Sequence, residues 1–114
     1  MDQQTRQAAT LFLQRLSARR PFSVAWLFGS RARVTQGLEK DIAQSDADIA
    51  IVLAGTPQGR VDLAVEMAAL AFDVMLETGV LIDPLPLWED EWRHPEVFAN
   101  PRLLANIRQD GLRL

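Results

Sequence analysis

The stretch that decides the fold is Phe28-Gly29-Ser30-Arg31-Ala32-Arg33, which follows directly on Ser23–Phe28, an apolar run that predicts a short buried strand. Glycine at a strand end lets the backbone approach a ligand closely. The amides that follow it and the Ser30 hydroxyl can donate hydrogen bonds to phosphate oxygens, and Arg31 and Arg33 add positive charge. Alone, the stretch indicates a phosphate site only weakly, because a Gly-Ser pair after a strand is usually a plain turn.

A second stretch, Ser45-Asp46-Ala47-Asp48, opens another predicted strand over residues 46–53. Side chains two residues apart on a strand point to the same face, so we expect Asp46 and Asp48 to lie side by side. Two adjacent carboxylates repel each other, which a divalent cation between them would relieve. Mg²⁺ suits this pattern because it takes one or two carboxylates and completes its shell with substrate phosphates and water. The alternative is a solvated strand start in which Asp48 caps a turn.

The remaining pattern predicts an α+β fold in which helices pack on a small mixed sheet. Helices are expected over 3–19, 60–78 and 101–109, a helical turn followed by a loop over 31–45, and a third strand over 80–87, bent or placed at a sheet edge by Pro84 and Pro86. The order is α-β-β-α-β-α in one domain, 1–114. The helix over 60–78 is apolar on most sides, which predicts deep packing. Trp88 and Trp92 are expected to pack the tail onto the sheet or to form a partner surface.

Composition excludes several classes of protein. The chain has no cysteine and one histidine, which argues against disulfides, Cys-ligated zinc and a Ser-His-Asp triad. Its net charge of -3 argues against stable nucleic-acid binding, although its 12 basic residues, all arginine except Lys40, leave room for a local basic face. The polar amino-terminal stretch and the absence of a long apolar run predict a cytoplasmic protein without a membrane span. Neither a P-loop nor a GxGxxG motif occurs.

Taken together, Gly29-Ser30-Arg31-Ala32-Arg33 and Ser45-Asp46-Ala47-Asp48-Ile49-Ala50 resemble the GS…DxD signature of the DNA polymerase β-like nucleotidyltransferase superfamily. The length of the chain and the tail over 100–111 resemble its minimal nucleotidyltransferase branch. The resemblance implies the polymerase β-like fold and two groups of site residues. The nucleotide would be bound by Gly29, Ser30, Arg31 and Arg33, and Mg²⁺ by the catalytic carboxylates Asp46, Asp48 and a third on the next strand, where Asp83 is the only acid.

The resemblance also implies a reaction, which is transfer of a nucleoside monophosphate, AMP from ATP, to a hydroxyl group. The minimal branch is similar to bacterial antitoxins that pair with a helical HEPN ribonuclease toxin and adenylylate a toxin tyrosine. This chain contains no tyrosine, so a tyrosine acceptor would lie on another molecule, in a hetero-oligomer or a transient complex. A homo-oligomer remains open as well. Two alternatives stand: a catalytically degenerate protein of the same fold that neutralises a partner by contact, and nucleotidyl transfer to RNA or a small molecule.

Overall fold

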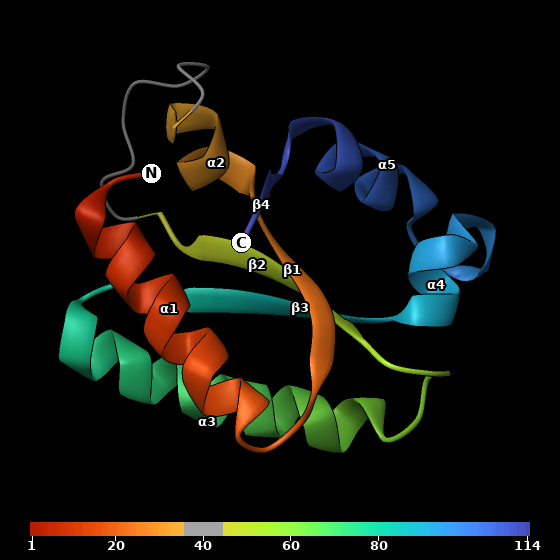
Figure 1. The fold of residues 1–114 in the computed structure, drawn as a ribbon, viewed down its shortest axis with the longest axis horizontal. Helices are drawn as coiled ribbons and strands as arrows, with labels where there is room; N and C mark the ends of the chain where they lie inside the picture. Colours follow the sequence, from red (N-terminus) through yellow and green to blue (C-terminus); the bar gives the residue numbers. More distant parts are fainter. Residues whose placement is uncertain (36–44) are drawn as a thin grey trace.

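A four-stranded mixed sheet organises the molecule, as seen in the computed structural model, which describes residues 1–35 and 45–114 (Figure 1). The strands are β1 (Phe22–Phe28), β2 (Ala47–Leu53), β3 (Ile82–Trp88) and β4 (Leu112–Arg113), in the spatial order β3-β2-β1-β4. β1 runs antiparallel to both β2 and β4, whereas β3 runs parallel to β2. The predicted mixed sheet is therefore confirmed, and the two prolines lie on an edge strand, where a missing N–H leaves no gap in the ladder.

Helices cover both faces of this sheet (Figure 1). They are α1 (Gln3–Ser17), α2 (Gly29–Thr35), α3 (Arg60–Thr78), α4 (Glu89–Arg93) and α5 (Pro101–Asp110), with a 3-10 turn at η1 (Pro95–Val97). α1 and α3 pack on one face, α5 packs on the other, and α2 follows the end of β1. The α+β fold and its predicted element order are confirmed, and the short elements α4, η1 and β4 are added to it. Residues 36–44 of the expected loop lie outside the described residues.

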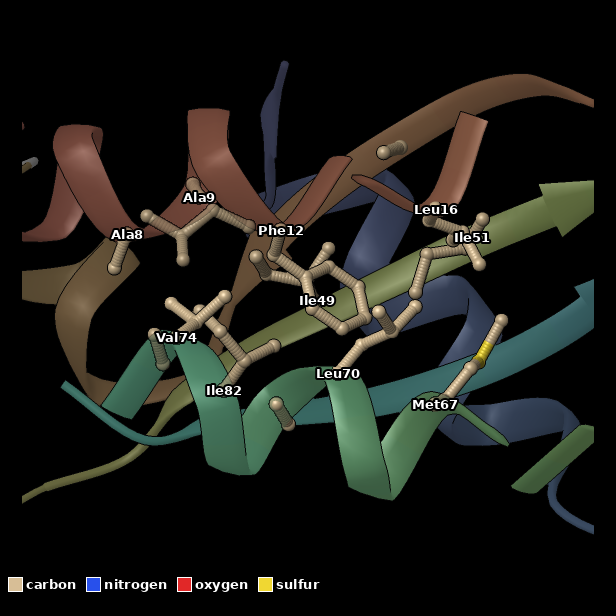
Figure 2. Packing of buried hydrophobic residues seen from close by; sticks show 14 of the residues in the cluster. Ala8, Ala9, Phe12, Leu16, Ile49, Ile51, Met67, Leu70, Val74 and Ile82 are labelled. Carbon is tan, nitrogen blue, oxygen red and sulfur yellow. The ribbon is translucent and has the colours of Figure 1, made fainter. Parts of the chain in front are cut away.

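The larger core lies between the sheet and the pair α1 and α3. Figure 2 shows Phe12 and Leu16 of α1 meeting Ile49 and Ile51 of β2, with Met67 of α3 closing the layer. These side chains come from every second residue of β2 and from one stripe of each helix, which are the periodicities that bury one face of each element. The opposite face of the sheet carries a smaller core.

That smaller core joins the sheet to α5. Ala50 and Val52 of β2 pack there against Leu104 and Ile107 of α5. Because successive strand side chains alternate between faces, every other residue of β2 points to α5, and this set includes Asp48. The position of α5 therefore decides what surrounds that carboxylate.

Helix α3 corrects one expectation. Only one of its two apolar stripes is buried, the one with Leu63, Met67 and Val74. The opposite stripe is open to solvent, with Val65 66% and Phe72 53% exposed. The predicted deep packing against the sheet holds for this one stripe, but the second apolar stripe is not buried, because the sheet covers the helix from one side and no described element covers the other.

The tryptophans of the tail pack onto the sheet, as expected for the first of the two alternatives. Trp88 at the end of β3 is buried. Trp92 of α4 lies against Trp26 of β1, with ring centroids 5.9 Å apart, and the Arg108 guanidinium of α5 stacks 4.2 Å from the Trp92 ring centroid. Within the described ranges, no helix is long and apolar enough to cross a membrane.

Candidate active site

The site is built around the end of β1, where Gly29 turns the chain into α2. Gly29 has φ +73°, a left-handed conformation that other L-residues rarely adopt. A Cβ atom at this position would also overlap Oδ2 of Asp48. Glycine is therefore required twice, for the turn and for the close approach of the backbone to a carboxylate. Ser30, the next residue, is half-buried beside this contact.

The carboxylates converge at the same end of the sheet. Asp48 pairs in register with Phe28 on the β1 side and with Asp83 on the β3 side. Paired residues of neighbouring strands point to the same face, so the side chains of Asp48 and Asp83 lie next to each other on the face that α5 covers. Asp46 immediately precedes β2 and is exposed. The structure thus brings the two predicted acids of β2 and β3 together although they are far apart in sequence.

Electrostatics confirm that Asp48 occupies a crowded negative environment. Burial of its carboxyl group, and after it the charge and hydrogen bonding of Asp83, raise the pKa of Asp48 from 3.8 to about 6. This pKa already includes a smaller upward contribution from the charge of Asp46 and a downward one from Arg33. The ionised form of Asp48 is therefore disfavoured by its own surroundings, which a bound cation would compensate.

The carboxylates at this end of the sheet fit a Mg²⁺ ion that is shared with a phosphate ligand. In residues 1–35 and 45–114 no group of three or more His, Asp or Glu side chains is arranged to hold a metal ion. Two neighbouring carboxylates, Asp48 and Asp83, nevertheless supply the hard oxygen donors that Mg²⁺ takes when substrate phosphates and water complete its shell. The site therefore fits a metal that arrives with a phosphate ligand better than one held by the protein alone.

The two arginines of the first stretch have different surroundings. Arg33 is exposed and close enough to Asp48 to influence its pKa. Arg31 is buried: its Nε and Nη2 atoms donate to the Ser45 carbonyl oxygen at 3.0 and 2.7 Å, and Nη1 donates to Thr5 Oγ1 at 2.8 Å. The expectation that Arg31 binds nucleotide needs revision, because its guanidinium holds the residue before Asp46 against α1.

Sequence reasoning missed the α1 side of this contact. The amide and hydroxyl of Thr5 donate to the two carboxylate oxygens of Asp2, the N-cap of α1, and the same hydroxyl accepts from Arg31. Asp2 followed by Thr5 has the spacing of a helix cap, which was a local signal. That Arg31 joins this cap is a long-range contact, and no local pattern predicts it.

Comparison with known proteins gives a likeness in fold but no match in sequence family. Neither a scan against models of protein families nor a search of curated proteins gives a match. A solved structure from Sulfolobus solfataricus, described as a "putative nucleotidyltransferase", is similar over 96% of this chain and 80% of its own, with 21% sequence identity and a TM-score of 0.56. The chain therefore has the fold of that protein, an α+β fold in which a small four-stranded mixed sheet carries helices on both faces.

Proposed function

We propose that this protein is a nucleotidyltransferase that moves a nucleoside monophosphate from a Mg²⁺-bound nucleoside triphosphate to a hydroxyl acceptor. The observation that carries the proposal is the contact between the Gly29 turn and Asp48, with Asp83 paired in register on the other side of Asp48. This contact puts a backbone that can approach phosphate beside two carboxylates that can share a cation. The fold of a protein described as a nucleotidyltransferase is consistent with it.

Each residue has a definite task in this proposal. The Gly29 turn, Ser30 and Arg33 hold the triphosphate, while Asp48 and Asp83 provide the protein ligands for a Mg²⁺ that arrives with it, and the exposed Asp46 adds negative charge beside them. The metal would supply charge stabilisation as pyrophosphate leaves. Asp83, on the outer side of the pair, would accept the proton of an incoming hydroxyl. The protein contributes mainly position and charge, as in other phosphoryl-type transfers.

Calorimetric titration of ATP, with and without Mg²⁺, tests the proposal. We expect binding that requires Mg²⁺ and that disappears in the variant Asp46→Asn/Asp48→Asn. A circular dichroism spectrum unchanged from wild type controls for folding of the variant. Binding that is independent of Mg²⁺, or that survives in the double variant, would contradict the assignment of the carboxylates. No binding at millimolar ATP would favour the alternative, a protein that acts on a partner by contact only.

The acceptor we propose is a tyrosine of a HEPN-type toxin, which would make this chain an antitoxin acting in the cytoplasm. The support is the resemblance of its motifs to the minimal branch and the absence of tyrosine in the chain itself. Incubation with α-labelled ATP and a HEPN protein encoded by a neighbouring gene should label the partner and not this chain. Label on added RNA or on a small molecule, and none on the partner, would move the proposal to the corresponding alternative acceptor.

A further inference from the structure

A cavity adjoins the Gly29 turn on the side of α5. Its volume is about 370 Å³, within the usual range of small-molecule sites, and its floor is formed by Phe28 and Gly29. One wall belongs to α5, which contributes Leu103, Asn106, Ile107 and Asp110. These four residues follow the spacing i, i+3, i+4, i+7, so they share one face of the helix. Arg33 lines the cavity as well.

The cavity and the carboxylates lie on the same face of the sheet. The Gly29 turn separates them. Phe28, on the cavity floor, is the register partner of Asp48. Asp83 lies on the far side of Asp48, because the strands run in the order β3-β2-β1-β4. A ligand at the Gly29 turn therefore has the metal-binding carboxylates on its β3 side and the cavity on its β1 side.

We propose that this cavity binds the nucleoside portion of the nucleoside triphosphate, with Asn106 reading the edge of the base. The inference rests on the proposed function, since it places the remainder of the same substrate. Phe28 and Leu103, which are only partly buried, offer apolar surface to a planar base. An Asn side chain presents a donor and an acceptor together, which matches the edge of adenine. The Asp110 carboxylate, which also lines the cavity, can accept hydrogen bonds from ribose hydroxyls.

The same arrangement decides against an acceptor in the cavity. An acceptor hydroxyl needs a base close to the reacting phosphorus, and Asp83 is on the side of Asp48 away from the cavity. We therefore place the triphosphate at the Gly29 turn, the nucleoside in the cavity beside α5, and the acceptor on the β3 side of Asp48.

The test compares ATP, GTP, CTP, UTP and inorganic tripolyphosphate, each titrated with Mg²⁺ into wild type, Asn106→Leu and Gln109→Leu. Gln109 is the control, because it is an exposed amide on α5 that does not line the cavity. For wild type we expect ATP to bind about tenfold more tightly than tripolyphosphate and than the least favoured nucleotide. In Asn106→Leu the preference among nucleotides should fall to within about twofold, with tripolyphosphate affinity unchanged. Gln109→Leu should match wild type.

The outcomes separate this inference from the proposed function. Equal affinity for tripolyphosphate and all four nucleotides, or a base preference that Asn106→Leu leaves intact, would overturn the nucleoside cavity while Mg²⁺-dependent binding still stands. Loss of tripolyphosphate binding in Asn106→Leu would also overturn it, because the side chain would then act on the phosphates. Absence of Mg²⁺-dependent binding of any of the five ligands by wild type would overturn both.

Discussion

At the scale of single residues, Gly29 and Asp48 constrain each other. The backbone of one leaves no room for a side chain because the carboxylate of the other occupies that space. Asp48 in turn has a raised pKa because burial and neighbouring acids disfavour its charge. Such a pair is unfavourable for stability, so it is a candidate for a functional contact that the remaining structure holds in place.

We predict that Asp48→Asn stabilises the metal-free protein at pH 7.5 while abolishing Mg²⁺-dependent ATP binding. The folded protein binds a proton on Asp48 more tightly than the unfolded chain does. The contribution of Asp48 to stability is therefore fully present below pH 3.8 and is lost as pH rises through about 6. After allowance for the solvent that reaches this half-buried group, removing the charge should gain about 1 kcal/mol, or about 4 °C in Tm.

Differential scanning fluorimetry from pH 4 to pH 8 checks this prediction. The difference in Tm between the variant and wild type should shrink as pH falls. Mg²⁺ with ATP should raise the Tm of wild type but not that of the variant. A variant that is less stable than wild type at pH 7.5 without metal would show that the Asp48 carboxylate is not strained in the folded protein.

Gly29→Ala should reduce stability more than Gly55→Ala does, and it should also reduce ATP affinity. Both glycines have positive φ, +73° and +85°, but a Cβ at Gly55 would meet nothing within 4 Å. The left-handed backbone alone should cost about 1–2 kcal/mol in each case, and overlap with Asp48 should add at least about 1 kcal/mol at Gly29. Urea denaturation of the two variants measures the difference, and equal losses would remove the steric argument.

At the scale of elements, Arg31 connects three of them. It lies in α2, donates to Thr5 in α1 and to the Ser45 carbonyl just before β2, and so fixes the start of the strand that carries Asp48. Arg33, two residues later in the same short helix, is exposed and lines the cavity under α5. Arg31 therefore holds three elements together, whereas Arg33 is the arginine to which we assign nucleotide binding in the proposed function.

We expect Arg31→Met to cost about 3 kcal/mol, because it leaves buried acceptors without their charged donor. Arg33→Met should change the free energy of unfolding by no more than about 1 kcal/mol but weaken ATP binding about tenfold. Chemical denaturation and calorimetry on both variants give the comparison. A large stability loss in Arg33→Met with unchanged ATP affinity would reverse the two assignments.

Helix α3 offers a second contrast at this scale. Val65→Lys lies on the open stripe and should change stability by less than about 0.5 kcal/mol, whereas Met67→Lys, fully buried two residues later, should cost more than about 4 kcal/mol. Thermal unfolding of the two variants measures this. Strong destabilisation by Val65→Lys would indicate that the open stripe is covered in the native protein, for example by another chain.

At the scale of the whole molecule, the sheet separates the larger hydrophobic core from the candidate site. α1 and α3 bury their core on one face, and the carboxylates and the cavity lie on the other. Ile51→Val, in the larger core, should therefore reduce stability by about 1 kcal/mol and leave the Kd for ATP unchanged. Calorimetry on the folded variant tests whether the core and the site are independent, and a shifted Kd would show that they are coupled.

Features set by neighbouring residues were predicted from the sequence, whereas features set by contacts between distant segments were not. β1, β2 and α3 were predicted within a residue or so because their apolar periods and the Gly79 cap are local signals. The neighbouring positions of Asp48 and Asp83 depend on the parallel register of β2 and β3. The helix between the strands predicted only a partly parallel sheet, and the resemblance implied only that a third carboxylate lies on the next strand. β4, the Arg31 contacts and the cavity under α5 join distant segments, and no spacing within one segment predicts them.

The contact between Trp26 and Trp92 has an optical consequence. Trp92 contacts both Trp26 and the Arg108 guanidinium, and Arg108 belongs to α5, the helix that lines the cavity. A nearby cation and a second indole ring both influence the emission of an excited tryptophan. A small shift of α5 as the cavity fills would therefore change intrinsic fluorescence, and the protein carries its own label for following ligand entry in a stopped-flow instrument.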